Sequence, residues 1–420
     1  MIESSATRSV RSALDSKTID KIAYLGALSL FLSTIEYLLP RPVPFMRLGL
    51  ANLPLILALE TFTVPAYAML VVVKVLGQAL VNGTLASYVF LFSLAGTVAS
   101  ATVMIACHRG LKEHISFLGI SVVGALASNV VQIVLSVAFI FGPSAWRILP
   151  LFLGIGLATG FLMGVFAQRF STHSRWWAQF AQKQAPRWSS ADADGNSDND
   201  DRRQNRRSRG GRSRRKRVDR LARFLNPRFR FWTGLCLIPG YLLLDGIQSR
   251  LAALVLFGIL AVLAGKRIRV GYYSVLTASI VFFHLLRPLG RTIASIGPLI
   301  ITSGAFQTGL MKALTLCGLI LISQFSVSRS LQLPGRIGSI LSRTFLYFEK
   351  ILDGKRTIRP RNFIATLDRT LLEMSRSEIE NQDDAALTGV RTAPRSILIG
   401  TSYFLLLNVV VWGDIFQHVL

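Results

Sequence analysis

The sequence contains little charge, and acidic residues are the scarcer kind. Only 16% of the 420 residues are charged, and 22 Asp and Glu stand against 47 Lys and Arg, which gives a formal net charge of +25. Hydrophobic residues make up 51% of the chain, and the mean hydropathy is +0.47. In soluble domains about a quarter of the residues are charged. The composition therefore indicates a membrane protein, in which lipid replaces water around much of the surface.

Cysteine is also rare, and the N-terminus lacks a secretion signal. The three cysteines, Cys107, Cys236 and Cys317, lie in or beside apolar runs without disulfide or metal-ligand spacing, so we expect packing residues and no metal site. Residues 1–20 are polar and have neither the apolar stretch nor the small-residue cleavage site of a signal peptide. We predict that they form a cytoplasmic tail.

Catalytic motifs are missing too. The P-loop-like string at Gly258–Arg267 has six residues between its glycines instead of four, and no Ser or Thr follows Lys266. The aspartate pairs at 200–201 and 383–384 lack the third carboxylate of a magnesium-diphosphate site and lie in polar segments. We therefore expect no catalytic residue, no cofactor and no enzymatic activity, so that any ATP drive comes from separate subunits.

Apolar runs dominate the segment 21–170 and predict a six-helix membrane domain. An even number of spans puts both ends on one side, and the basic turn 108–114 and the basic linker place that side inside. Arg41 and Arg47 then fall on the outer face. The predicted spans are Ile22–Leu39, Leu48–Phe62, Pro65–Val81, Leu85–Cys107, Ile115–Phe141 and Ile148–Ala167.

A hydrophilic linker, residues 171–229, separates the two apolar halves. It passes from an acidic stretch to RRQNRRSRGGRSRRKRVDR and holds too few apolar residues to form a core. We predict a disordered cytoplasmic tether that is attracted to anionic membrane lipid. Nucleic-acid binding is disfavoured because no aromatic residues are interleaved with the arginines. If Arg202–Arg217 nevertheless bound nucleic acid, deleting that run would abolish function and leave the spans intact.

The second half predicts about five spans and a cytoplasmic helical region. Residues 326–395 are hydrophilic and rich in cations, which places them inside, and the final span and C-terminus occupy 396–420. The domain 230–325 and the final span contain the runs Phe231–Leu244, Leu251–Ala264, Val270–Leu286, Pro298–Phe325 and Ser396–Trp412. Apolar residues at helical spacing predict one amphipathic helix in the cytoplasmic region: Ile337, Ile340, Leu341, Phe345 and Phe348.

Polar residues inside the predicted spans are the candidates for a solute site. A polar group in lipid is expensive unless it faces a cavity or a partner, so such residues tend to be functional. The alternative is structural, with Glu36 paired to Arg47 or Lys74. The excess of cations favours an acidic or hydrogen-bond-rich small solute. The candidate substrate-binding residues are Glu36, Arg47, Asn52, Lys74, Asn129 and Gln132.

Small residues mark one face of the first predicted span. Ala23 and Ala27, with Gly26 beside them, form a small-x-x-x-small pattern that lets another helix approach closely. We predict that this face is a helix-helix docking surface.

The first half resembles the Gx transporter family, also called heptaprenyl diphosphate synthase component I. The resemblance rests on MRLGLANLPLILAL, VVVKVLGQALVNGTLASYVFLFSLAGTVASATVM and FLGISVVGALASNVVQIVLS. It implies a fold like the substrate-binding S component of energy-coupling factor (ECF) transporters: six helices, both termini inside, an outward ligand pocket, and an Ala-x-x-x-Ala face, here Ala23 and Ala27, that docks on the coupling subunit. The family usually has histidine where this chain has Ser128, before Asn129, so the identity of the solute does not transfer.

The second half is similar in layout to the transmembrane coupling (T) component of those transporters. The likeness lies in LIITSGAFQTGLMKALTLCGLILISQFSVSRSLQLPGRIGSIL, an apolar span followed by a cytoplasmic helical region. That family presents Ala-Arg-Gly motifs to its ATPases, and this chain has none. ATPase coupling would then fall to other residues, and Arg329, Arg336 and Arg343 are the first candidates.

Together these features predict an all-α polytopic membrane protein in the cell (inner) membrane with a cytoplasmic N-terminus. The predicted function is an ECF-type importer subunit that binds a small organic solute, such as a vitamin or an isoprenoid or flavin-type precursor, and couples to separate ATP-binding subunits. The alternative is a non-catalytic membrane partner of a polyprenyl diphosphate synthase in isoprenoid or quinone metabolism.

Overall fold

The computed structural model describes most of both predicted membrane domains. The described residues are 16–38, 49–85, 87–111, 114–181, 227–266, 268–287, 289–296, 299–327, 335–353, 364–365, 367–369, 371–372 and 402. Most of the predicted linker and nearly all of the predicted final span lie outside them. The first helix begins at Ser16, so it takes in the last five residues of the predicted tail.

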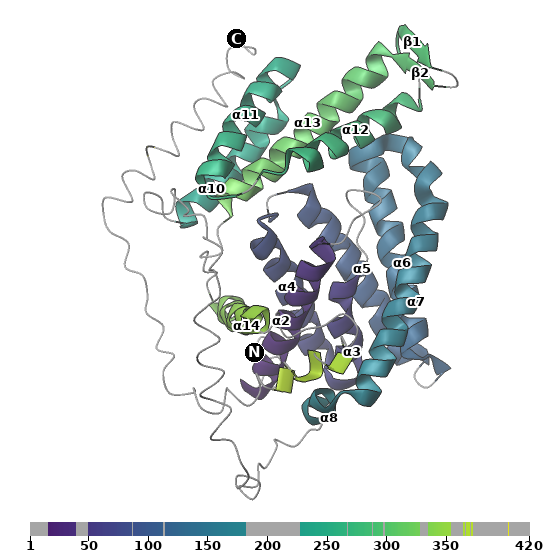
Figure 1. Ribbon diagram of the computed structural model, residues 1–420, viewed down its shortest axis with the longest axis vertical. Helices are drawn as coiled ribbons and strands as arrows, with labels where there is room; N and C mark the ends of the chain where they lie inside the picture. Colours follow the sequence, from purple (N-terminus) through teal and green to yellow (C-terminus); the bar gives the residue numbers. More distant parts are fainter. Residues whose placement is uncertain are drawn as a thin grey trace, which may run out of the picture.

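The first unit, residues 16–181, is an all-α bundle, drawn in purple to blue in Figure 1. Each of the six predicted spans corresponds to a helix or a run of helices. The elements are α2 (Ser16–Leu38), η1 (Leu50–Asn52), α3 (Leu53–Thr61), α4 (Val64–Asn82), α5 (Tyr88–Leu111), α6 (Phe117–Leu135), η3 (Ser136–Phe141), η4 (Gly142–Ile148), α7 (Leu149–His173) and α8 (Arg175–Ala181).

Proline and glycine set the ends of several of these helices. Pro54, Pro65 and Pro150 lie in the first turns of α3, α4 and α7, where the missing N–H costs nothing and the fixed φ suits the helix. Gly83 ends α4 with a φ of 66°, and its N–H caps the carbonyls of Ala79 and Leu80. These signals explain why the predicted boundaries agree with the structure to within a few residues here.

A glycine row on α7 brings it close to α6. A Cβ atom at Gly160 would lie 2.9 Å from Cα of Val122, and one at Gly164 would lie 2.5 Å from Cα of Leu118. Both distances are shorter than real contacts, so only glycine fits. The row lets the two backbones touch, as small residues do between membrane helices.

The predicted linker begins too early. Helix α7 continues to His173 and α8 occupies Arg175–Ala181, so residues 171–181 belong to the bundle. The carboxylate of Asp368 accepts hydrogen bonds from Ser174 Oγ and from the N–H of Trp176, at 3.0 Å in the second case. Because Trp176 is also buried, this segment is held by packing and capping where the sequence indicated a solvated chain.

The second unit, residues 227–353, contains four apolar helices, a β-hairpin and an amphipathic helix. Its elements are α10 (Pro227–Leu242), α11 (Ile247–Leu263), α12 (Val270–Leu285), β1 (Thr292–Ile296), β2 (Leu299–Thr302), α13 (Ser303–Ser326) and α14 (Gly335–Asp353). Except for the hairpin, the order agrees with the prediction.

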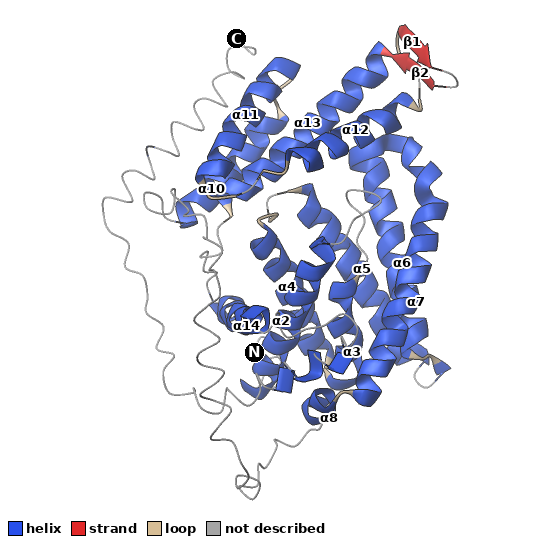
Figure 2. Ribbon diagram, in the orientation of Figure 1, coloured by secondary structure: helices blue, strands red, loops and turns tan. Residues whose placement is uncertain are grey.

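The β-hairpin corrects the prediction of one span over Pro298–Phe325. Helix α13 begins only at Ser303, and β2 pairs antiparallel with β1, with Thr292 opposite Thr302 (Figure 2, red). The two runs TIASI and LIIT are rich in β-branched residues, which favour strands. The predicted span included the second run, LIIT, so the strand was missed.

The second unit contacts the first in several places. Helix α14 packs on α2 and α4, while Ser323 Oγ on α13 donates to the Gly83 carbonyl at 2.7 Å. A third contact joins Phe141 of η3 to Phe283 of α12, with ring centroids 4.6 Å apart. Figure 1 shows α12 and α13 running obliquely across one end of the first bundle.

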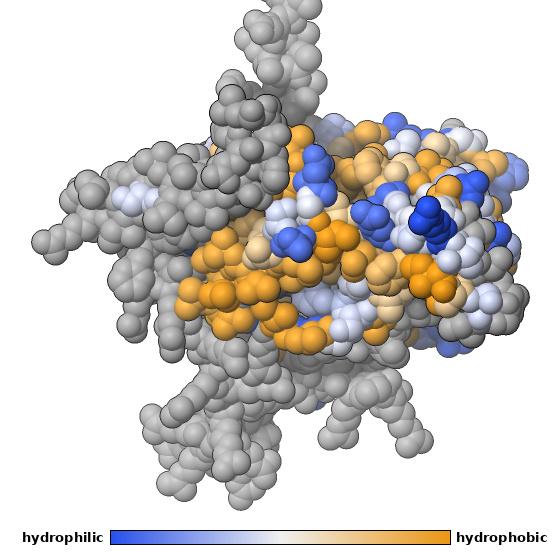
Figure 3. Space-filling view, turned by 90° about the horizontal axis from the view of Figure 1, so that it is seen from above, coloured by the Kyte–Doolittle hydropathy of each residue, from blue (hydrophilic) through white to orange (hydrophobic). Residues whose placement is uncertain are grey.

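The helices have the length and composition of membrane spans. Among the described residues, five helical stretches qualify: Lys17–Glu36, Val64–Asn82, Tyr88–Leu111, Phe117–His173 and Ser303–Ser326. Figure 3, seen from above, shows a largely apolar face with hydrophilic side chains in separate groups. The all-α fold class is confirmed, and the chain is a multi-pass membrane protein.

Candidate functional site

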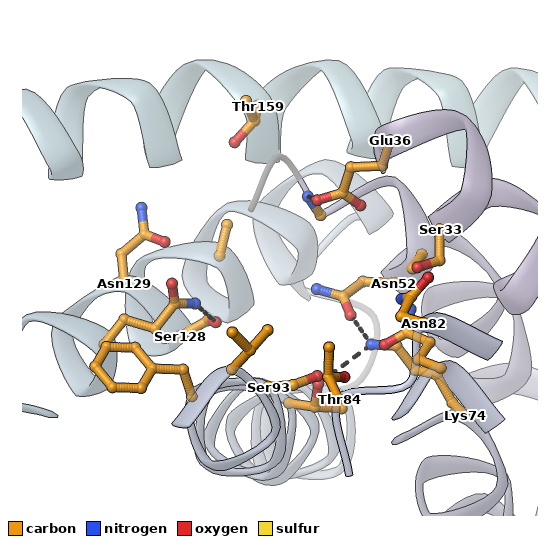
Figure 4. Close-up of a pocket in the computed structure, with 18 residues that line it drawn as sticks. Ser33, Glu36, Asn52, Lys74, Asn82, Thr84, Ser93, Ser128, Asn129 and Thr159 are labelled. Carbon is orange, nitrogen blue, oxygen red and sulfur yellow. Dashed lines mark hydrogen bonds between the residues drawn. The ribbon is translucent and has the colours of Figure 1, made fainter. Parts of the chain in front are cut away.

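A polar cavity lies inside the first bundle, near the C-terminal ends of α2 and α4 (Figure 4). Its volume is about 70 Å³, room for several waters or a small polar solute. The lining residues come from α2 to α7: Ser33, Glu36, Gly49, Ala51, Asn52, Lys74, Gln78, Asn82, Thr84, Val89, Phe92, Ser93, Thr97, Ala125, Ser128, Asn129, Gln132 and Thr159.

Lys74 is the centre of one wall. Its ammonium group donates to Asn52 Oδ1 and, at 3.3 Å, to Thr97 Oγ1, so one buried cation ties α4 to η1 and α5. The side chain is 2% exposed. A charge this deeply buried needs polar partners, and the two named here come from different elements, η1 and α5. Figure 4 shows Lys74 and Asn52 on the same side of the cavity.

Glu36 is the acidic residue of the cavity lining. Its Oε1 atom accepts the N–H of Gly49 at 3.2 Å, and the side chain is 5% exposed. Gly49 has a φ of 86°, a left-handed conformation that glycine adopts without strain. The carboxylate therefore joins the end of α2 to the turn before η1. Among the described lining residues, Glu36 and Lys74 are the charged ones.

Helix α6 forms the opposite wall with two amides. Asn129 Nδ2 donates to the Phe152 carbonyl at 2.8 Å, and Gln132 Nε2 donates to Ser128 Oγ at 2.9 Å. Glycines leave space for both amides: a Cβ at Gly156 would lie 2.2 Å from Asn129 Nδ2, and one at Gly96 would lie 3.0 Å from Gln132 Nε2. The amides are thus fixed before any solute enters.

Five of the six predicted substrate-binding residues line this one cavity: Glu36, Asn52, Lys74, Asn129 and Gln132. Arg47 lies outside the described residues. Their role in binding remains a prediction. The residues chosen from the sequence as polar groups within apolar spans nevertheless lie close together in the structure. Sequence reasoning missed the smaller polar residues, although several follow helical spacing: Ser93 with Thr97 and Ser128 with Gln132 are four apart. The missed polar residues are Ser33, Gln78, Asn82, Thr84, Ser93, Thr97, Ser128 and Thr159.

The predicted docking face on α2 is covered by α14. Ala23 and Ala27 are fully buried, and a Cβ at Gly26 would lie 2.9 Å from Val73 Cγ1 and 3.1 Å from Thr344 Cγ2. Gly26 therefore sits where α4 and α14 both approach α2. The small-residue pattern correctly indicated a close helix contact.

Two further pairs hold α14 against α2. Tyr24 and Tyr347 stack with ring centroids 4.1 Å apart, and Arg343 forms an ion pair with Asp20. Burial raises the pKa of the Tyr347 phenol to about 12, so this ring stays neutral at physiological pH. The Arg343–Asp20 pair is half exposed, and such pairs contribute about 1 kcal/mol or less.

The three predicted coupling arginines separate in the structure. Arg343 pairs with Asp20 of α2, Arg336 is exposed, and Arg329 lies outside the described residues. The predicted apolar face of α14 is also only partly right. Ile340, Leu341 and Phe348 are buried, whereas Ile337 is 37% exposed.

Metal ligands do not gather in the part of the chain that the structure describes. No group of three or more His, Cys, Asp or Glu side chains is arranged to hold an ion there. Cys107, Cys236 and Cys317 are free thiols.

Comparisons with known families match the two units separately. Residues 25–170 match the family model described as heptaprenyl diphosphate synthase component I, and residues 226–329 match a domain of unknown function. Neither curated proteins nor solved structures gave a match. The first unit, which contains the cavity, is therefore the part of this multi-pass membrane chain that matches the family model of heptaprenyl diphosphate synthase component I.

Proposed function

We propose that the chain is the membrane subunit of an importer for a small organic solute, driven by separate ATP-binding subunits. The first unit binds the solute, and the second transmits the ATPase cycle to it. The observation that carries this proposal is the seating of α14 on the Ala23–Gly26–Ala27 face of α2. This contact joins an amphipathic helix of the second unit to the bundle that contains the polar cavity.

The position of the cavity supports uptake. It lies near the C-terminal end of α2, whereas Asp20, at the other end of that helix, lies beside α14. We place the N-terminus and α14 in the cytoplasm of a cell (inner) membrane, following the positive-inside rule. The cavity then lies in the outer half of the bundle, as capture of an external solute requires.

The second unit also contacts the loop that closes one side of the cavity. Asn82 and Thr84 line the cavity, and the Gly83 carbonyl between them accepts the hydrogen bond from Ser323 of α13. Lys266 is close by, with its Nζ 3.4 Å from the position of a Cβ at Gly83. A displacement of α13 would therefore act on the cavity wall directly.

The orientation of the two units supports a rocking movement. Alternation of the spans puts Gly83 outside and the basic turn at Lys266 inside, yet these residues are neighbours. Both units therefore cannot stand upright in one bilayer in this arrangement, in which α13 crosses the end of the first bundle (Figure 1). Rocking of the first unit about its α2–α14 contact would expose the cavity first to one side and then to the other.

The outer face of α14 is the surface we assign to the ATPases. Arg336 is exposed there, together with Leu346, which is 49% exposed. Apolar side chains beside a cation are typical of a protein interface.

Affinity purification of the full chain from its native membrane tests this assignment. We expect ATP-binding proteins and ATPase activity to copurify, and Arg336→Glu to reduce both at least tenfold. Arg169→Glu, at an exposed position of α7, is the control and should change neither. Full ATPase recovery with Arg336→Glu contradicts the assignment.

The family description supports a second function, a membrane partner of a polyprenyl diphosphate synthase. In this role too, we propose that the chain itself catalyses nothing. The cavity is too small for a polyprenyl chain, so the synthase would have to bind elsewhere. Copurification of prenyl synthase activity in place of ATPase activity would favour this function over transport.

A further inference from the structure

One acceptor in the cavity has no partner within the described protein. Gln132 Oε1 is buried and makes no hydrogen bond, while the Nε2 atom of the same amide is held by Ser128. A buried carbonyl oxygen without a donor costs about 1–3 kcal/mol. Since Ser128 fixes the amide, this oxygen is satisfied only by a group that enters the cavity.

The opposite wall requires the complementary group. Lys74 presents a buried ammonium to the cavity, and its positive charge favours an acceptor such as a carbonyl or carboxylate oxygen. Lys74 lies across the cavity from the α6 amides in Figure 4. A solute that spans the cavity would therefore meet an acceptor at one end and a donor at the other.

The charge of the described lining restricts the class of solute further. One carboxylate, Glu36, balances one ammonium, Lys74. An anionic solute would be attracted by Lys74 and repelled by Glu36. A cationic solute would be attracted by Glu36 and repelled by Lys74. Either solute would bury a net charge. A solute without net charge avoids that cost.

We propose that the cavity binds a small solute of zero net charge, neutral or zwitterionic, whose N–H or O–H group donates to Gln132 Oε1 while an acceptor group faces Lys74. Gln132 is then a specificity-determining residue. This inference rests on the proposed solute-binding function of the first unit. Of the two solutes expected from the excess of cations, acidic or hydrogen-bond-rich, it selects the second.

The experiment is a thermal-shift and calorimetric screen of the purified full chain against three sets of probes of similar size. The sets are neutral or zwitterionic compounds (α-amino acids and pyrimidine bases), monocarboxylates and primary amines. We expect the strongest stabilisation from the first set, and about tenfold weaker binding or worse of the best compound to Gln132→Leu. Hits confined to carboxylates or to amines, or no hits in any set, would overturn the proposal.

Gln132→Glu replaces the Nε2 donor by an oxygen to which the Ser128 hydroxyl can donate instead, and it adds a negative charge, so we expect it to shift the preference toward primary amines. Gln168→Leu, at an exposed position of α7, is the control and should bind like the unaltered chain. Unchanged affinity and selectivity in both Gln132 variants would also overturn the proposal. ATPases are absent from this screen, so failure of the coupling function leaves its outcome unaffected.

Discussion

The two units bury polar side chains for different purposes. In the first unit, Lys74 and Gln132 point into a shared cavity. In the second, Arg230 and Arg250 donate to backbone carbonyls: Arg230 Nε to Phe325 at 3.1 Å, and Arg250 Nε to Leu244 at 2.6 Å. Buried polar side chains thus join helix ends in the second unit and form a candidate site in the first.

This difference separates structural from functional polar groups in a membrane protein. A guanidinium that meets carbonyls at helix ends satisfies acceptors that the helices cannot satisfy themselves. For an amide with a buried, unpartnered oxygen, packing does not offset the free-energy cost of burial. Hydropathy alone gives both kinds of residue the same signal, and only their partners distinguish them.

The largest effect on stability is expected from Arg250→Met in the second unit. Arg250 also donates to Met311 O at 3.3 Å and to Thr315 Oγ1, so the change leaves several buried acceptors unpaired. We expect the free energy of unfolding to fall by about 3 kcal/mol. Thermal unfolding in detergent measures this, and a change below about 1 kcal/mol would break the distinction between the units.

Lys74→Met in the first unit should act mainly on solute binding. Removing the buried cation relieves its own desolvation but leaves the buried Glu36 carboxylate and Asn52 Oδ1 without it, so we expect stability to fall by about 2 kcal/mol, less than for Arg250→Met. Affinity for the best solute from the screen should fall about 100-fold, since a charge-assisted hydrogen bond is lost. Calorimetry of both variants, with Lys17→Met as an exposed control, checks the comparison. Strong destabilisation with unchanged affinity would make Lys74 structural.

Gly26→Leu tests the contact between the units. The added side chain would collide with Val73 and Thr344, so we expect α14 to leave α2 and ATP-driven uptake to fall about tenfold or more. Solute binding by the chain should persist. Gly154→Leu is the matched control, because a Cβ at Gly154 has no neighbour within 4 Å. If Gly154→Leu reduced uptake as much as Gly26→Leu, the close contact at Gly26 would not be what couples the units.

The smallest effect is expected from Ser323→Ala. It removes one hydrogen bond to Gly83, about 1 kcal/mol, from the loop beside the cavity. We expect the bound solute to dissociate a few times faster, which stopped-flow fluorescence can measure. Ser339→Ala, at an exposed position of α14, should leave the rate unchanged. An unchanged rate with Ser323→Ala would show that α13 does not hold the loop.

The sequence predicted most spans and much of the cavity because burial in lipid penalises polar groups strongly. Lys74, Asn129 and Gln132 stand out in apolar helices for that reason. Ser93 and Thr97 were missed because a hydroxyl can bond to the carbonyl one turn back, as Thr34 does to Leu30 at 2.9 Å, so Ser and Thr are common in such helices.

Contacts between distant segments were beyond sequence reasoning. The small face of α2 predicted that a helix would dock there, but nothing local to Gly26 indicates Thr344 as the neighbour. The Asp368 cap on α8 was hidden for the same reason, since it depends on residues almost two hundred positions apart. The β-hairpin was missed because its second strand continues directly into α13.

A cross-linking measurement tests the central claim most directly, that α14 couples the second unit to a solute-binding first unit. In a chain whose three cysteines are replaced, Tyr24→Cys and Tyr347→Cys would be joined by a short thiol-specific cross-linker in native membranes. The account predicts efficient cross-linking, loss of ATP-driven uptake, and retained solute binding, with recovery of uptake after cleavage of the cross-linker. Absence of cross-linking, or full uptake by the cross-linked chain, would contradict it.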